Sequence, residues 1–170
     1  HYPENEETLE HVAKQEHIAI QQAKRYFEIH KDEIACILIE PIQAEGGDRH
    51  FRQEFHKELR KLADTYEALL IYDEVQTGIG LTGKFWAHEH FVEPDIIAFG
   101  KKAQVCGILA GKRLDEVETN CFKVSSRINS TWGGNLVDMV RFQRILEVIE
   151  QDNLVENAAN LGDDLLEGLH

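Results

Sequence analysis

Short apolar runs alternate along the chain with longer segments in which apolar residues recur at helical spacing. The runs predict strands at Ile34–Ile39, Ala68–Tyr72, Ile96–Phe99 and Gly107–Ala110. The helical spacing predicts helices at Glu7–His30, Phe51–Tyr66, Leu136–Ile149 and Leu154–Leu169. An unbroken apolar run such as Ile34–Ile39 is typical of a strand that is buried on both faces. The alternation therefore predicts an α/β fold with a mostly parallel sheet flanked by helices.

Chemically reactive side chains follow three of these predicted strands. Glu40 follows the first strand, Asp73 the second, and the pair Lys101 and Lys102 comes directly after Ile96–Phe99 and Gly100. In open α/β sheets, ligands bind beyond the carboxyl ends of the strands. We therefore expect a functional site at this edge of the sheet.

The Asp73 strand has a second interpretation, because an acidic residue closing an apolar strand also resembles the Mg²⁺-binding strand of ATPases. Gly78–Lys84 matches the phosphate-binding pattern G-x-x-x-x-G-K, but Phe85 follows where that pattern requires Ser or Thr. The order is also reversed, because the glycine-rich segment comes after the acidic strand. An ATPase remains a remote alternative.

Lys102 is a candidate nucleophile. An amine attacks a carbonyl only in its neutral form, so its pKa must fall through burial or through a neighbouring positive charge. Lys101 supplies such a charge, and the apolar run before it supplies burial. Spacing alone is equally compatible with two solvated lysines at the end of a strand.

The histidines and the segment Asn129–Asn135 carry weaker signals. His88 and His90 are two apart, and His50 and His56 are six apart, which matches no recognised zinc pattern. We therefore expect surface or loop histidines and no metal site. Asn129–Asn135 places small residues and hydroxyls before a predicted helix, which fits either a phosphate cradle or a simple helix cap.

Composition limits the partners. Acidic residues outnumber basic ones 31 to 18, and the net charge is −13, which argues against nucleic acid and anionic membranes. No apolar run approaches the ~20 residues of a membrane helix. Three cysteines without paired or metal-type spacing, Cys36, Cys106 and Cys121, fit a reducing cytoplasm. The chain starts with His1 and its last helical pattern continues to His170 without a stop signal, so we expect a piece of a longer protein.

Four segments occur together in the order of a known family. They are Ile39–Asp48, Tyr72–Gly78, Ala98–Lys102 and Ser130–Asn135. With them the chain resembles the class III (ω-amino acid) aminotransferases, enzymes of fold type I that use pyridoxal 5′-phosphate (PLP). The sequence resembles most closely the members that act on the ε-amino group of lysine. This similarity rests on Gly46–Phe51, Phe99–Gly107 and Asn129–Asn135.

The resemblance implies a role for each site residue. Lys102 would form the Schiff base with PLP and later move a proton, and Asp73 would keep the pyridine nitrogen protonated. Gln76 would hydrogen-bond the phenolic oxygen of the ring, and Val75 would pack against its face. Three further residues complete the implied set: Thr131 at the phosphate of the partner subunit's cofactor, and Glu45 and Asn129 at the substrate.

The resemblance also implies the organisation and the reaction. Residues 1–170 would form part of the PLP-binding large domain of a cytoplasmic homodimer, with an N-terminal part and a small C-terminal domain outside this chain. The reaction would transfer the ε-amino group of L-lysine to 2-oxoglutarate, giving 2-aminoadipate 6-semialdehyde and glutamate. An ω-aminotransferase acting on ornithine or 4-aminobutyrate, and an inactive fragment, remain as alternatives.

Overall fold

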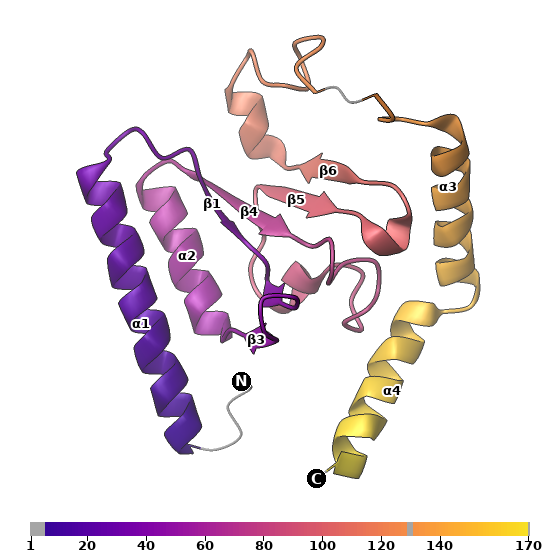
Figure 1. The fold of residues 1–170 in the computed structure, drawn as a ribbon, viewed down its shortest axis with the longest axis horizontal. Coiled ribbons are helices and arrows are strands. Elements are labelled where there is room, and N and C mark those ends of the chain that lie inside the picture. The colour runs from indigo at the N-terminus through magenta and orange to yellow at the C-terminus, as the bar shows by residue number, and fades with distance from the viewer. Residues whose placement is uncertain (1–5, 129–130, 170) are drawn as a thin grey trace. The chain divides into compact units, whose positions relative to one another are not determined.

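The computed structural model describes residues 6–128 and 131–169, which form two compact units. The first unit contains the described residues up to Asp73, together with His88–Pro94. The second contains Glu74–Ala87 and the described residues from Asp95 onward. Figure 1 labels the four α-helices of the described residues and all their strands except β2 (Ile42–Gln43).

The first unit contains a pair of parallel sheet strands covered by two helices. Its elements are α1 (Glu6–Ile29), β1 (Cys36–Ile39), β2 (Ile42–Gln43), β3 (Arg49–His50), α2 (Gln53–Thr65) and β4 (Leu69–Asp73). β1 and β4 pair in parallel, with Cys36 opposite Leu69 and Ile39 opposite Tyr72. The short strands β2 and β3 pair antiparallel in the connection between β1 and α2.

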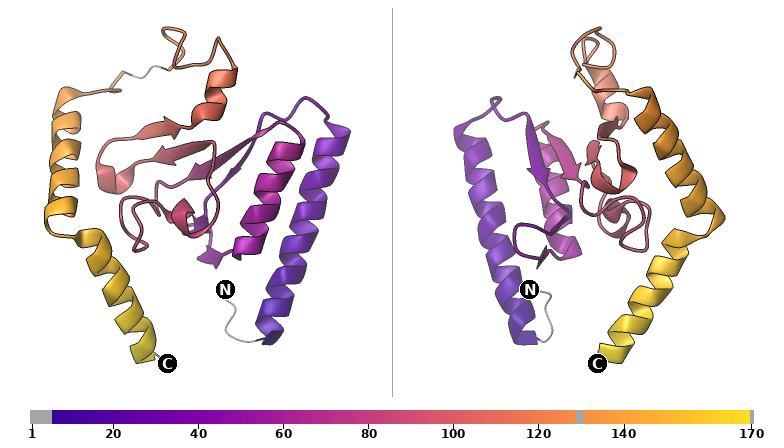
Figure 2. Two further views of the ribbon diagram at one scale, coloured as in Figure 1. Left: turned by 180° about the vertical axis from the view of Figure 1, so that it is seen from behind. Right: turned by 45° about the vertical axis from the view of Figure 1, so that its right-hand side comes forward.

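Two helices pack on one face of this sheet and form the core. α1 and α2 lie side by side against β1 and β4 in all views (Figures 1 and 2). The main cluster consists of Phe55, Leu59, Ala63, Leu70 and Tyr72, with Ile37 and Ile39 packed against it. Since burying one such large side chain contributes roughly 1.5–3 kcal/mol, this cluster is the principal source of stability in the unit.

Strand β1 departs from the prediction in one respect. The apolar run predicted burial on both faces, but the side chain of Leu38 is 64% exposed. Successive side chains of a strand point to opposite faces, and both helices of the unit cover the face that carries Ile37 and Ile39. The prediction of burial on both faces is therefore wrong for this strand as the structure describes it.

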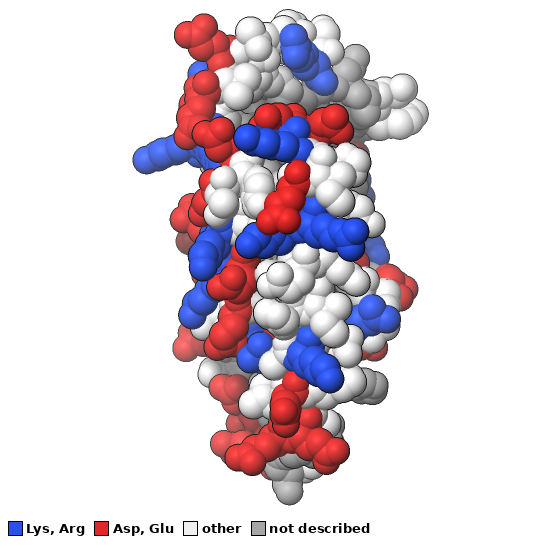
Figure 3. All heavy atoms as spheres, turned by 90° about the vertical axis from the view of Figure 1, so that its left-hand side faces the viewer, with Lys and Arg blue, Asp and Glu red and all other residues white. Residues whose placement is uncertain are grey.

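A buried ion pair joins α1 to the start of α2. Glu16 is 7% exposed, and its carboxylate accepts from the backbone N–H of Arg52 at 2.9 Å and from Arg52 Nε at 2.6 Å. Arg52 is the N-cap of α2, where a carboxylate also offsets the partial positive charge of the helix N-terminus. Outward from this pair, the face that carries α1 has acidic and basic side chains interspersed among its described residues (Figure 3).

The second unit combines an antiparallel strand pair with two consecutive helices. Its elements are β5 (Ile96–Phe99), the short 3₁₀ turns Lys101–Ala103 and Lys112–Glu116, β6 (Gly107–Ala110), α3 (Leu136–Gln151) and α4 (Leu154–Leu169). A further 3₁₀ turn, Ala87–His90, follows the loop that starts at Glu74. β5 and β6 pair antiparallel, with Ile96 opposite Ala110 and Phe99 opposite Gly107.

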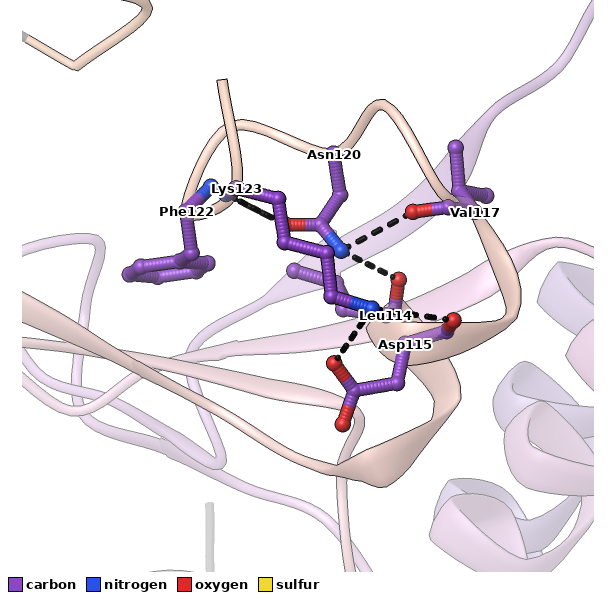
Figure 4. Close-up of polar contacts among 6 residues, drawn as sticks. All are labelled: Leu114, Asp115, Val117, Asn120, Phe122 and Lys123. Atoms are coloured by element: carbon purple, nitrogen blue, oxygen red, sulfur yellow. Dashed lines mark hydrogen bonds and ion pairs between the residues drawn. The ribbon is translucent and has the colours of Figure 1, made fainter. Parts of the chain in front are cut away.

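One asparagine organises the loop after β6. The side-chain amide of Asn120 donates to the carbonyls of Leu114 and Val117, both at 2.9 Å (Figure 4). Its side-chain oxygen accepts from the backbone N–H groups of Phe122 at 3.0 Å and Lys123 at 3.3 Å. Asn120 is 9% exposed, so these bonds replace water for almost all of its polar capacity.

The predicted helices and strands all occur, with ends that differ by a few residues at most. Within the described part of the chain, no helix has the length and apolar character needed to cross a membrane.

Candidate functional site

Lys102 lies in a tight turn that directly follows strand β5. The turn begins after Gly100, which is buried, and Lys101 adopts a left-handed conformation with φ of 45°. As a result, consecutive lysines face different surroundings: Lys101 is exposed and Lys102 is half-buried. The backbone therefore distinguishes the two lysines, and Lys102, the one chosen from the sequence, is the less exposed.

The amine of Lys102 lies beside two other predicted site residues. Lys102 Nζ donates a hydrogen bond to the backbone carbonyl of Gln76. Val75 flanks the same turn, because a Cβ atom built on Gly100 would lie 3.7 Å from both methyl groups of Val75. The second unit thus brings Val75, Gln76 and Lys102 together around Gly100.

The surroundings of Lys102 favour a neutral amine. Burial holds the pKa of Lys102 below its ordinary value, and the positive charge of Lys101 lowers this pKa further. Both effects act in the direction that a nucleophilic amine requires. The pKa direction expected from the sequence is therefore present in the structure.

The loop that carries Val75 and Gln76 is held by the buried carboxylate of Glu74. Glu74 is 1% exposed, and its Oε2 accepts from the backbone N–H of Ala87 at 2.6 Å and from the Thr77 hydroxyl at 3.4 Å. The Glu74 backbone N–H donates to the carbonyl of Ala98 in β5 at 2.8 Å. Sequence reasoning missed this residue, and its only signal was its position directly after Asp73.

The glycine-rich segment Gly78–Lys84 is a packed turn. The N–H groups of its three glycines are already used: Gly78 donates to the carbonyl of Glu74 at 2.9 Å, Gly80 to that of Phe85 at 3.1 Å and Gly83 to that of Gly80 at 3.2 Å. A Cβ atom on Gly83 would lie 2.9 Å from Ala159 in α4, so the glycine permits close packing of that helix. A phosphate-binding loop needs free N–H groups that lead into a helix. This arrangement contradicts the ATPase alternative.

Two other predicted residues lie in the first unit. Asp73 is the half-buried last residue of β4. Glu45 is exposed in the turn between β2 and β3, where the N–H groups of Gly47 and Asp48 both donate to the carbonyl of Ala44 at 3.0 Å. Asp73 therefore has a fixed backbone position in a sheet, whereas Glu45 lies at the end of a short hairpin.

The segment before α3 is a capped helix start where the structure describes it. Asn135 is the N-cap, and its side chain accepts from the backbone N–H of Val137 at 2.9 Å. Thr131 lies in an exposed turn just before it. Asn129 lies outside the described residues. The cap interpretation of this segment is confirmed, and the predicted role of Thr131 at a phosphate remains a prediction.

One histidine contradicts the expectation of surface or loop positions. His56 is completely buried in α2, and its Nδ1 lies 2.7 Å from the Tyr72 hydroxyl. This hydroxyl gives the buried imidazole a polar partner, which the helical pattern alone did not reveal. Within the described residues, no group of three or more histidine, cysteine or acidic side chains is placed to bind a metal.

Comparisons with known proteins agree on one family. A family model described as "Aminotransferase class-III" matches residues 1–170. An L-lysine-epsilon aminotransferase from Mycobacterium tuberculosis is 61% identical over 145 residues, which cover 85% of this chain and 32% of that protein. A 4-aminobutyrate aminotransferase from Emericella nidulans is 41% identical over 171 residues, which cover 99% of this chain and 33% of that protein.

The fold comparison gives the same answer. A solved lysine aminotransferase from M. tuberculosis, described as being in the internal aldimine form, matches with a TM-score of 0.88 and 57% sequence identity. The match covers 95% of this chain and 37% of that one. The predicted fold, part of an α/β aminotransferase domain with a mostly parallel sheet flanked by helices, is confirmed. The chain spans about a third of the length of the curated relatives that it matches.

Proposed function

Because the chain belongs to the class III aminotransferase family, we propose that the whole protein is a PLP-dependent L-lysine 6-aminotransferase. It transfers the ε-amino group of L-lysine to 2-oxoglutarate and gives 2-aminoadipate 6-semialdehyde and glutamate. The 61% identity to an L-lysine-epsilon aminotransferase carries this choice of substrate. The protein acts in the cytoplasm, which agrees with three free cysteines.

The chemistry of the second unit fits PLP. An aldehyde cofactor needs an amine that is neutral for part of the time, and the pKa of Lys102 is lowered by burial and by Lys101. A flat ring also needs an apolar side chain beside it, and Val75 flanks the turn that holds Lys102. When bound, PLP supplies a protonated ring that withdraws electrons from the substrate carbon.

Each residue of this chain has one task in the proposal. The Lys102 amine binds the cofactor covalently, and once substrate displaces it, moves a proton between the substrate carbon and the cofactor carbon. The Asp73 carboxylate holds a proton at the pyridine nitrogen. The Gln76 side chain donates to the phenolic oxygen, and Val75 packs against the ring. The hydrogen bond from Lys102 Nζ to the backbone carbonyl of Gln76 holds the amine beside Gln76.

Three further residues complete the proposed site. Thr131 binds the phosphate of the cofactor in the partner subunit, which makes the whole protein a homodimer. Glu45 contacts the substrate and helps one site accept both a terminal amine and an α-carboxylate. Asn129 contacts the substrate. The chain itself is the part of the large domain that carries Lys102 and Asp73, with further site residues contributed by other parts of the whole protein.

Reductive trapping tests the covalent role. Borohydride is added to the whole protein with PLP, and the labelled peptide is identified by mass spectrometry. We expect the label on Lys102, its loss in Lys102→Ala and its retention in Lys101→Ala, which is the matched control. A label on Lys101 contradicts the assignment. Labelling of the whole protein but not of residues 1–170 alone identifies this chain as an inactive fragment.

Substrate turnover tests the lysine claim. The 41% identical relative acts on 4-aminobutyrate by name, so 4-aminobutyrate is the second candidate, with ornithine as the third. We expect kcat/KM for L-lysine with 2-oxoglutarate to exceed the values for both other amines by at least about tenfold. Equal or better turnover of ornithine or 4-aminobutyrate removes the lysine claim and leaves the family unchanged.

A further inference from the structure

His56 is an imidazole buried inside an aromatic cluster. Its ring lies 4.2 Å from that of Phe91 and 5.5 Å from that of Tyr72, measured between ring centroids. Phe51 and Phe55 approach it at 6.0 and 6.1 Å. An apolar ring of similar size would fill this space and would need no hydrogen-bond partner. Packing alone therefore does not explain a histidine at this position.

One short contact joins two buried polar groups. Tyr72 and His56 are both 0% exposed, and the Tyr72 hydroxyl lies 2.7 Å from His56 Nδ1. Burial lowers the pKa of His56 to about 4, and the backbone carbonyl of Pro41 opposes only part of this shift. The imidazole is therefore neutral near pH 7.

The contact fixes the end of a strand that is important for function. Tyr72 directly precedes Asp73, the last residue of β4. Adjacent side chains of a strand point to opposite faces, so holding Tyr72 against α2 sets the direction in which Asp73 leaves the other face.

We propose that His56 and Tyr72 act together as positioning residues that aim the Asp73 carboxylate at the pyridine nitrogen of the cofactor. The proposal rests on the role given to Asp73 above. The two side chains joined by this buried hydrogen bond depend on each other, because the position favours two polar partners or two apolar ones. Removing one partner takes this buried hydrogen bond away from the other, and the strand end shifts in response.

The pyridine nitrogen itself reports the effect. The whole protein is loaded with PLP labelled with ¹⁵N in the ring, and the ¹⁵N chemical shift is recorded for wild type, Tyr72→Phe, His56→Phe and the double variant. Tyr66→Phe is the control, because Tyr66 packs on Phe27 in the separate cluster of the first unit. Steady-state kinetics are measured with PLP in excess, well below the melting temperature.

The expected pattern is specific to positioning. The wild type and Tyr66→Phe show a protonated pyridine nitrogen. Each single variant moves the ¹⁵N shift toward the unprotonated value and lowers kcat by about tenfold with little change in KM, since a displacement of about an ångström has effects of this order. The double variant recovers most of both values. If His56→Phe does not fold, Tyr72→Phe decides alone.

Two results overturn the proposal. Single variants that melt earlier but keep the wild-type ¹⁵N shift and kcat show that the pair only packs. A double variant as impaired as its worse single variant shows that the His56–Tyr72 bond is not the coupling. An unprotonated pyridine nitrogen or no bound PLP in the wild type instead refutes the role of Asp73 and the proposed function.

Discussion

Acidification should destabilise the first unit, and the contribution of His56 to this loss follows from its lowered pKa. Burial lowers the pKa of His56 from 6.5 to about 4. Between these pH values the unfolded chain binds a proton at His56 and the folded chain does not. The free energy of unfolding therefore keeps its full value with respect to His56 above pH 6.5, and it decreases as the pH falls from 6.5 toward 4. A pKa unit is worth about 1.4 kcal/mol, so the full loss over this shift is about 3.5 kcal/mol. About 2 kcal/mol of it falls between pH 7 and pH 5.

Hydrogen exchange in the whole protein measures this loss where it acts. The amides of Leu70 and Tyr72 in β4 report the opening free energy of the strand, after correction for the intrinsic pH dependence of exchange. Other groups also titrate in this range, so the comparison is with the double variant His56→Phe, Tyr72→Phe, which lacks the buried imidazole of His56. We expect the wild type to lose about 2 kcal/mol more than this variant from pH 7 to pH 5. Equal losses would refute a lowered pKa for His56.

Three further predictions concern the site. Lys101→Gln removes a charge that lowers the pKa of Lys102, so reductive trapping of Lys102 should need a higher pH than in wild type; an unchanged pH profile contradicts the electrostatic cause. Asp73→Asn should lower kcat by about a hundredfold or more and the affinity for PLP by less than about tenfold, as measured by kinetics and cofactor titration; equal losses count against the electron-sink role. Glu74→Ala leaves the buried N–H of Ala87 without its acceptor and should reduce its opening free energy in hydrogen exchange by about 2–3 kcal/mol, against about 1 kcal/mol for Glu74→Gln; the opposite order contradicts the charge-assisted bond.

Periodicity was sufficient for the main elements because their burial is regular. α2 turns Phe55, Leu59 and Ala63 toward the sheet at helical spacing, and β4 buries Leu70 and Tyr72 at a spacing of two. The strands β2 and β3 were not predicted, because each has only two residues and neither spacing can be detected at that length. Leu38 shows the opposite limit: an apolar run predicts a strand correctly but does not determine which of its faces is covered.

The sequence predicted which residue types form the site, but it did not predict the role of each residue. Asp73 and Glu74 are adjacent carboxylates, and the sequence singles out Asp73 by its position directly after an apolar run and by family resemblance. The structure shows that Glu74 is 1% exposed and bonded to the Ala87 N–H, while Asp73 is half-buried. Likewise, His56 occupies an inward position of α2, but a buried histidine needs a polar partner, and Tyr72 is 16 residues away in the sequence. Such long-range pairing leaves no local pattern.

Asp73 and Lys102 share one physical arrangement: each has a neighbour in sequence that is buried. Asp73 lies between Tyr72, at 0% exposure, and Glu74, at 1%. Lys102 is followed by Ala103, at 0%, and preceded two positions earlier by buried Gly100. A buried neighbour fixes the backbone in the core, and the alternation of a strand or the tightness of a turn then sets the direction of the reactive side chain. Substitutions at these buried neighbours should therefore alter catalysis through geometry, even though their side chains contact neither cofactor nor substrate.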